Sequence, residues 1–168
     1  MPPRTNNIAS RAREMLVPAD GRAWTPGDMV RALKRYRKIE EARLKIAHRG
    51  GGGGLEVCRM RAEMVDEALK HLWAFMLEQT ASAMPKRPKL SLVATGGYGR
   101  SEMNPCSDVD MLFLLPGNGT QVPEGMSSLV TQFVTTMWDS GLKVGDSSTR
   151  YVGETIALAN SDNQVKTA

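Results

Sequence analysis

The feature that most restricts the fold is the stretch DVDMLFLL at residues 108–115, where two aspartates open an apolar run. An uninterrupted apolar run of this length indicates a buried β-strand. Side chains on a strand alternate between its two faces, so Asp108 and Asp110 are expected on one face and Val109, Met111 and Phe113 on the other. The sequence therefore predicts that two carboxylates converge where a strand begins.

Two carboxylates this close repel each other, and one of them takes up a proton unless a cation lies between them. Magnesium suits such a pair, because it prefers hard oxygen ligands, keeps several waters and is commonly held by one or two carboxylates plus substrate phosphates. We therefore predict that Asp108 and Asp110 are ligands of Mg²⁺.

A glycine-rich stretch, GGYGR, comes shortly before the aspartates. Gly96, Gly97 and Gly99 permit positive φ angles and carry no side chain, so their backbone N–H groups can approach an anion. Arg100 adds a positive charge, and a short helix expected to start near Ser101 would add its dipole. These residues are predicted to bind the phosphates of a nucleoside triphosphate.

Each half of this pattern has an ordinary explanation when it stands alone. A glycine turn is often only a turn, and Asp-x-Asp is often a surface strand or a calcium loop. The stretch is not a dinucleotide fingerprint, because Glu102 stands where the last glycine belongs. The combination with a buried strand favours in-line displacement at an α-phosphate, with metal ions stabilising the attacking and leaving oxygens. Ser107 and Asn104 are interpreted as turn and positioning residues that either touch the nucleotide or only cap the turn; we include Ser107 among the nucleotide-binding candidates.

The rest of the chain has the pattern of a helical pair followed by a mixed α and β region. Thr25, Pro26 and Asp28 predict the start of a helix over 26–48. An apolar stripe is expected along it at Met29, Ala32, Tyr36, Ile39, Ala42 and Ile46. A second helix is expected over 55–82, with an apolar stripe at Cys58, Ala62, Val65, Leu69, Leu72 and Met76.

Further along, strands are predicted over 90–95 and 108–115, a helix over 123–139 and a third strand within LKVGDSSTRY. Ser161 is interpreted as the cap of a last helix. We divide the chain into a tail at 1–24, a helical hairpin at 25–84 with a glycine-rich connector at 50–54, and a core at 85–168 that is expected to be truncated at its C-terminus.

Composition and charge restrict the possible functions less than the motif does. The chain of 168 residues is the size of one domain, and its hydrophobic fraction of 41% is ordinary for a globular protein. No stretch has the length of a membrane span or the apolar core of a signal peptide, so a cytoplasmic protein without membrane contact is expected. The basic excess lies within residues 1–49, which hold 12 Lys and Arg against 5 Asp and Glu. We interpret it as a solvated helix face, and a nucleic-acid partner is not expected.

The motif GGYGRSEMNPCSDVDMLFLL resembles the signature of the DNA-polymerase-β-like nucleotidyltransferases. It is more closely similar to the N-terminal domain of the uridylyltransferases that modify the nitrogen-signalling protein PII, which residues 96–100, 102–105 and 107–110 match. The resemblance implies an α+β fold, with a small mixed sheet and flanking helices, preceded by the helical hairpin. It also implies a magnesium-dependent enzyme of nitrogen regulation that transfers UMP from UTP to a tyrosine of a PII-like protein acceptor.

Two other interpretations stay open. The chain could be an adenylyltransferase of the same superfamily that acts on another acceptor. It could also be a truncated, non-catalytic module that binds a nucleotide or a partner protein.

Asp146 is the candidate for a third carboxylate. Transferases of this superfamily typically bring one from a neighbouring strand, and Asp146 lies in the β-like stretch KVGDSSTR. Gly145, Asp146 and Ser147 also make a good turn, and the related family usually has histidine at this position. Both interpretations of Asp146 remain open on the sequence.

Overall fold

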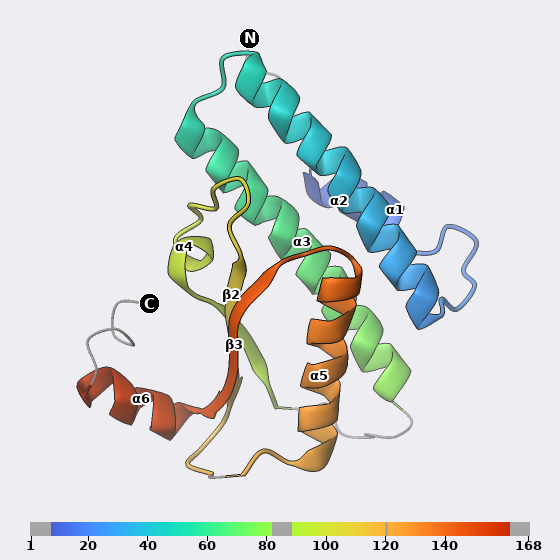
Figure 1. Ribbon diagram of the computed structural model, residues 1–168. Helices are drawn as coiled ribbons and strands as arrows, with labels where there is room; N and C mark the ends of the chain where they lie inside the picture. Colours follow the sequence, from blue (N-terminus) through green and yellow to red (C-terminus); the bar gives the residue numbers. More distant parts are fainter. Residues whose placement is uncertain (1–7, 82–88, 120, 162–168) are drawn as a thin grey trace.

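The computed structural model describes residues 8–81, 89–119 and 121–161, and within these ranges the side chain of Asp146 is not described. Three helices form its N-terminal part: α1 (Ile8–Leu16), α2 (Pro26–Arg49) and α3 (Gly54–Thr80). Helices α2 and α3 run antiparallel as the predicted hairpin (Figure 1). Helix α1 lies in the segment interpreted above as a tail and packs against both of them.

The start of α2 is determined by local chemistry. The Thr25 hydroxyl accepts a hydrogen bond from the backbone N–H of Asp28, and the Asp28 carboxylate accepts one from the backbone N–H of Thr25 at 3.0 Å. This capping box satisfies two of the N–H groups that a helix start leaves unpaired. The hydrogen bonds from Thr25 lower the pKa of Asp28 to about 2. Pro26 occupies the first turn, as predicted.

The buried face of α2 differs from the predicted apolar stripe. Ile46, expected on the stripe, is 70% exposed, whereas Glu40 is only 1% exposed. Glu40 can be buried because Arg11 of α1 donates hydrogen bonds to both of its carboxylate oxygens, at 2.6 and 2.5 Å. Glu40, a charged residue that the apolar periodicity did not place on the buried face, is therefore buried there because it is paired with Arg11. The buried residues of α2 are Met29, Leu33, Tyr36, Glu40 and Leu44.

Helix α3 is buried on more than one side, because it contacts α1, α2 and α5 (Glu124–Asp139). Its predicted stripe is buried except at Cys58, which is half-buried. The residues buried beyond that stripe are Val57, Met64, Ala68 and Phe75.

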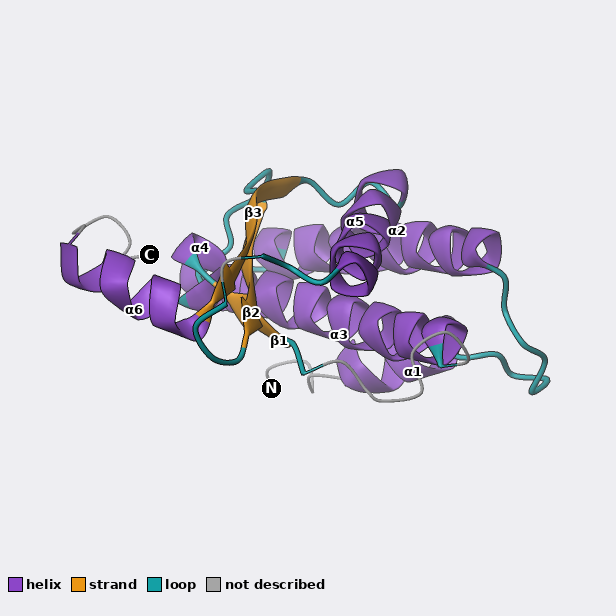
Figure 2. Cartoon of the chain, turned by 90° about the horizontal axis from the view of Figure 1, so that it is seen from below, coloured by secondary structure: helices purple, strands orange, loops and turns teal. Residues whose placement is uncertain are grey.

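The predicted small mixed sheet is confirmed. It has the order β1 (Ser91–Ala94), β2 (Val109–Leu115) and β3 (Val144–Tyr151), with β1 antiparallel and β3 parallel to β2. Figure 2 shows the sheet nearly edge-on, with α5 and the long helices on one side of it. The central strand is therefore covered on the face that its apolar residues occupy.

One aromatic contact joins the sheet to the helices. Phe133 of α5 packs edge-to-face against Phe113 of β2 and against Trp73 of α3, with ring centroids 5.7 Å apart in both pairs. Phe113 and Phe133 are both fully buried. These rings hold the strand that carries the two aspartates against the hairpin.

The last helix corrects a prediction. Ser161, expected to cap the start of a helix, is the last residue of α6 (Val152–Ser161), and its hydroxyl donates to the Ala157 carbonyl at 3.1 Å. A helix continuing to residue 168 lies outside the described residues. Helix α6 has no buried residue and extends away from the sheet (Figure 2). None of the helices described is long and apolar enough to cross a membrane.

Candidate functional site

The two aspartates lie at the start of β2, with the alternation expected of a strand. Burial alternates strictly along the strand, and Val109, Met111, Phe113 and Leu115 are the buried residues. Asp110 lies on the opposite face and is half-buried, whereas Asp108, the residue before the strand, is exposed. Packing on one face thus turns the carboxylate of Asp110 toward the other.

Both aspartates converge on Gly145 of β3. A Cβ atom at Gly145 would lie 2.2 Å from Oδ1 of Asp110 and 3.0 Å from Cβ of Asp108. The ladder between β2 and β3 is irregular between Val109 and Met111, next to this approach. On the sequence, Gly145 is interpreted only as part of a turn, although a glycine inside a strand is itself a signal that another group comes close to the backbone.

Gly96 borders the same carboxylate from the other side. Its φ is +57°, and a Cβ there would lie 2.9 Å from Oδ2 of Asp110. The backbone carbonyl of Asp110 also accepts a hydrogen bond from the N–H of Thr95 at 3.1 Å. The Asp110 carboxylate therefore lies between Gly96 and Gly145, and no side chain at either position separates it from the backbone.

The short helix is placed differently from the prediction. Helix α4 is formed by Gly96–Gly99 itself, and Ser101, where a helix was expected to start, has a positive φ of 59° that ends it. Gly99 is required for packing, because a Cβ there would lie 2.7 Å from the Ala94 carbonyl oxygen. Gly97 is more open, with the Glu102 carbonyl oxygen at 3.6 Å as its nearest such contact. Phosphate binding by Gly96, Gly97 and Gly99 stays a prediction.

The helical hairpin holds this glycine segment in place. Tyr98 is buried, and its hydroxyl donates to Oδ1 of Asp66 on α3 at 2.5 Å. Burial, and then the bond to Asp66, raise the pKa of Tyr98. Further along the loop, the Sγ of Cys58 donates to Oδ1 of Asn104 at 3.5 Å. Tyr98 was not among the predicted site residues, since its role depends on a contact 32 positions away.

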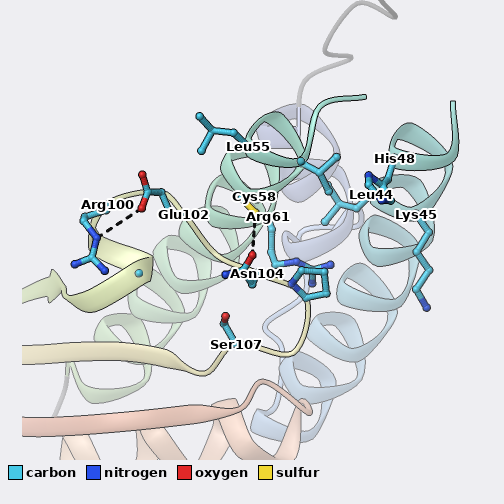
Figure 3. A pocket seen from close by; sticks show the side chains of 14 residues that line it. Leu44, Lys45, His48, Leu55, Cys58, Arg61, Arg100, Glu102, Asn104 and Ser107 are labelled. Atoms are coloured by element: carbon cyan, nitrogen blue, oxygen red, sulfur yellow. Dashed lines mark hydrogen bonds and ion pairs between the residues drawn. The ribbon is translucent and has the colours of Figure 1, made fainter. Parts of the chain in front are cut away.

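A cavity of about 810 Å³ lies between the hairpin and this loop (Figure 3). Gly97, Arg100 and Ser107 line it, so three of the predicted nucleotide-binding residues share one space. Asp108 and Asp110 are not in its lining. Arg100 approaches Glu102, with its Nε 3.7 Å from Oε2, and both side chains are exposed.

Asp108 and Asp110 fit a magnesium ion whose remaining ligands would be water and phosphate oxygens. Among the side chains described, no three from His, Cys, Asp and Glu form a group that could enclose a metal. Asp108 and Asp110 are hard oxygen donors that both approach Gly145, and Mg²⁺ is commonly held by one or two carboxylates together with water and phosphate oxygens. Asp146 follows Gly145 on β3, but its side chain lies outside the description, so its role as a third ligand stays a prediction.

A glycine segment that packs against a strand opening with Asp-x-Asp, in a small mixed sheet, defines a nucleotidyltransferase-type domain. Residues 1–143 match the family model described as GlnE, glutamate-ammonia ligase adenylyltransferase, and the chain belongs to this family.

Curated relatives support the resemblance drawn from the motif. The chain is 38% identical over 125 residues to the bifunctional uridylyltransferase/uridylyl-removing enzyme of Aromatoleum aromaticum, covering 74% of the chain and 13% of the relative. It is 37% identical over 143 residues to the enzyme of that name from Rhodospirillum rubrum, covering 82% of the chain and 14% of the relative. The chain thus spans about one seventh of the length of these relatives, and its similarity to uridylyltransferases is confirmed.

Proposed function

We propose that this domain transfers UMP from UTP to a tyrosine hydroxyl of a PII-like protein, in a reaction that needs Mg²⁺. The names of the relatives support uridylyl transfer. The observation that supports the proposal is the approach of Asp108 and Asp110 to Gly145, because two residues with oxygen ligands suited to Mg²⁺ lie beside the same backbone position.

The chain's own residues have distinct tasks in this reaction. Asp108 and Asp110 would hold Mg²⁺, which when bound offsets the negative charge of the triphosphate and of the transition state. The N–H groups at the start of α4, which a helix start leaves without partners in the helix, would donate to phosphate oxygens. Arg100 adds a positive charge at the edge of the same cavity.

The chemistry is a displacement at phosphorus. The acceptor hydroxyl oxygen forms a bond to the α-phosphorus, the bond from that phosphorus to the β-phosphate oxygen breaks, and pyrophosphate leaves. The hydroxyl proton passes to a base or to water. The domain contributes positioning and charge to this step, because the attacking and leaving oxygens must lie in line.

Adenylyl transfer is the second candidate. The matching family model is described as an adenylyltransferase of glutamate-ammonia ligase, so ATP and that ligase are the alternative donor and acceptor. Nucleotide or partner binding without turnover is the third.

One experiment separates these functions. The protein is incubated with Mg²⁺ and UTP or ATP labelled at the α-phosphate, together with a PII protein or glutamate-ammonia ligase, and label on each acceptor is measured. We expect UMP on PII, lost in Asp110→Asn and retained in Asp139→Asn, a matched change at an exposed aspartate at the end of α5. Label from ATP on the ligase would support the second candidate, and nucleotide binding without label the third.

A further inference from the structure

Three cations from separate elements surround the loop between α4 and β2. Lys45 of α2 and Arg61 of α3 line both the large cavity and an adjoining one of about 280 Å³. Lys143, just before β3, lines the smaller cavity. Among the described residues none of the three has an ion pair, whereas Arg37 in the smaller cavity is paired with Glu41 at 2.9 Å.

Arg61 is the most informative of the three. It is half-buried, and its Nε is buried without a hydrogen-bond partner. A buried donor left unpaired costs the desolvation free energy of that group, and a charged group costs more. Figure 3 shows Arg61 reaching from α3 toward the loop that carries Asn104 and Ser107. An anion that enters the cavity would therefore give this donor a hydrogen-bond partner.

Phosphate oxygens match this arrangement. The cavity that Arg61 and Lys45 line is the one that Gly97 and Ser107 line from the opposite wall. A guanidinium offers planar, paired donors suited to phosphate, and an ammonium acts as a point charge beside it. A group with several negative charges uses both cations together, and a diphosphate is such a group.

We infer that Arg61 and Lys45 bind the β- and γ-phosphates of the nucleotide, and the pyrophosphate that leaves. The inference rests on the proposed function, since it concerns the same nucleotide. It gives the helical hairpin a part in substrate binding: α2 and α3 supply one wall of the site, and the glycine segment supplies the other.

The test uses isothermal titration calorimetry with pyrophosphate and with UTP in the presence of Mg²⁺. Arg61→Gln is compared with Arg59→Gln, the same change at an exposed position of the same helix. We expect the dissociation constants for UTP and pyrophosphate to rise at least tenfold in Arg61→Gln and by less than twofold in Arg59→Gln. Pyrophosphate should also displace UTP competitively.

Lys45→Gln, with Lys38→Gln as its control, repeats the test at exposed positions of α2 where folding is not at risk. Unchanged pyrophosphate affinity in both Arg61→Gln and Lys45→Gln would overturn the inference, as would pyrophosphate binding that leaves UTP affinity unaltered. UTP binding that persists in both variants would leave the proposed function standing. Pyrophosphate binding that needs Arg61, in a protein that binds no UTP, would instead retain the anion site and remove the proposed donor.

Discussion

Gly145 gives the sharpest prediction, because the structure sets the size of the perturbation. In Gly145→Ala the new methyl group would lie 2.2 Å from Oδ1 of Asp110, whereas nonbonded atoms make contact at about 3.5 Å. The carboxylate must then move by roughly 1 Å. The methyl group would also lie 3.0 Å from Cβ of Asp108, which cannot turn away as a carboxylate can. Both predicted metal ligands are displaced by one added carbon.

Gly145→Ala should lower the rate of nucleotide transfer more than it lowers the stability of the fold. A displacement of about 1 Å at a reacting centre can lower a rate about 100-fold. Local overpacking lowers the free energy of unfolding by about 1–3 kcal/mol. This loss is partly offset, because replacing glycine by alanine lowers the conformational entropy of the unfolded chain. We expect nucleotide transfer in Gly145→Ala to fall about 100-fold, and the free energy of unfolding by about 1 kcal/mol.

Initial rates of label transfer over a range of Mg²⁺ concentrations, together with urea unfolding, measure the two quantities. Gly53→Ala is the control, since a Cβ at Gly53 meets no atom within 4 Å. Transfer by Gly145→Ala within twofold of the unaltered protein, with the same Mg²⁺ requirement, would show that the convergence of the aspartates is not what the reaction depends on.

Three further predictions concern the surroundings of the site. Gly97→Val should weaken UTP binding in calorimetry while the melting temperature changes little, because its Cβ makes only an ordinary contact at 3.6 Å; equal affinity would argue against a phosphate site there. Arg11→Ala leaves the buried carboxylate of Glu40 with only the longer ion pair to Arg43, at 3.9 Å, and should lower the free energy of urea unfolding by about 3 kcal/mol; a loss below about 1 kcal/mol would mean that Arg43 or water replaces Arg11. The raised pKa of Tyr98 means that its neutral form stabilises the fold below pH of about 10 and that this contribution is lost as pH rises further. Melting temperatures should therefore fall less between pH 9 and 11 in Tyr98→Phe than in the unaltered protein, and identical slopes would contradict this.

The parts of the fold that the sequence predicted depend on local rules. The capping box at Thr25 uses residues three apart, and the alternation along β2 follows from the geometry of a strand. Both can be worked out from neighbouring residues, and both are present in the structure. The helical hairpin follows from two apolar periodicities separated by glycines, although the stripe on α2 is rotated from the prediction.

The parts that the sequence did not predict depend on distant contacts. Helix α1 is stabilised through Arg11 by a carboxylate 29 positions away, and α4 is held through Tyr98 by Asp66. Gly145 matters only because β3 pairs beside the start of β2. A glycine inside a predicted strand is the one signal in the sequence that could have identified it.

The central claim is that Asp108 and Asp110 together bind a divalent cation. Binding of Mn²⁺, a spectroscopic substitute for Mg²⁺, is measured by electron paramagnetic resonance without nucleotide, so that the result does not depend on turnover. We predict that Asp108→Asn and Asp110→Asn each weaken Mn²⁺ binding at least tenfold, about 1.4 kcal/mol, whereas Asp139→Asn leaves it unchanged. Equal Mn²⁺ affinity in the unaltered protein and in both site variants would contradict the account.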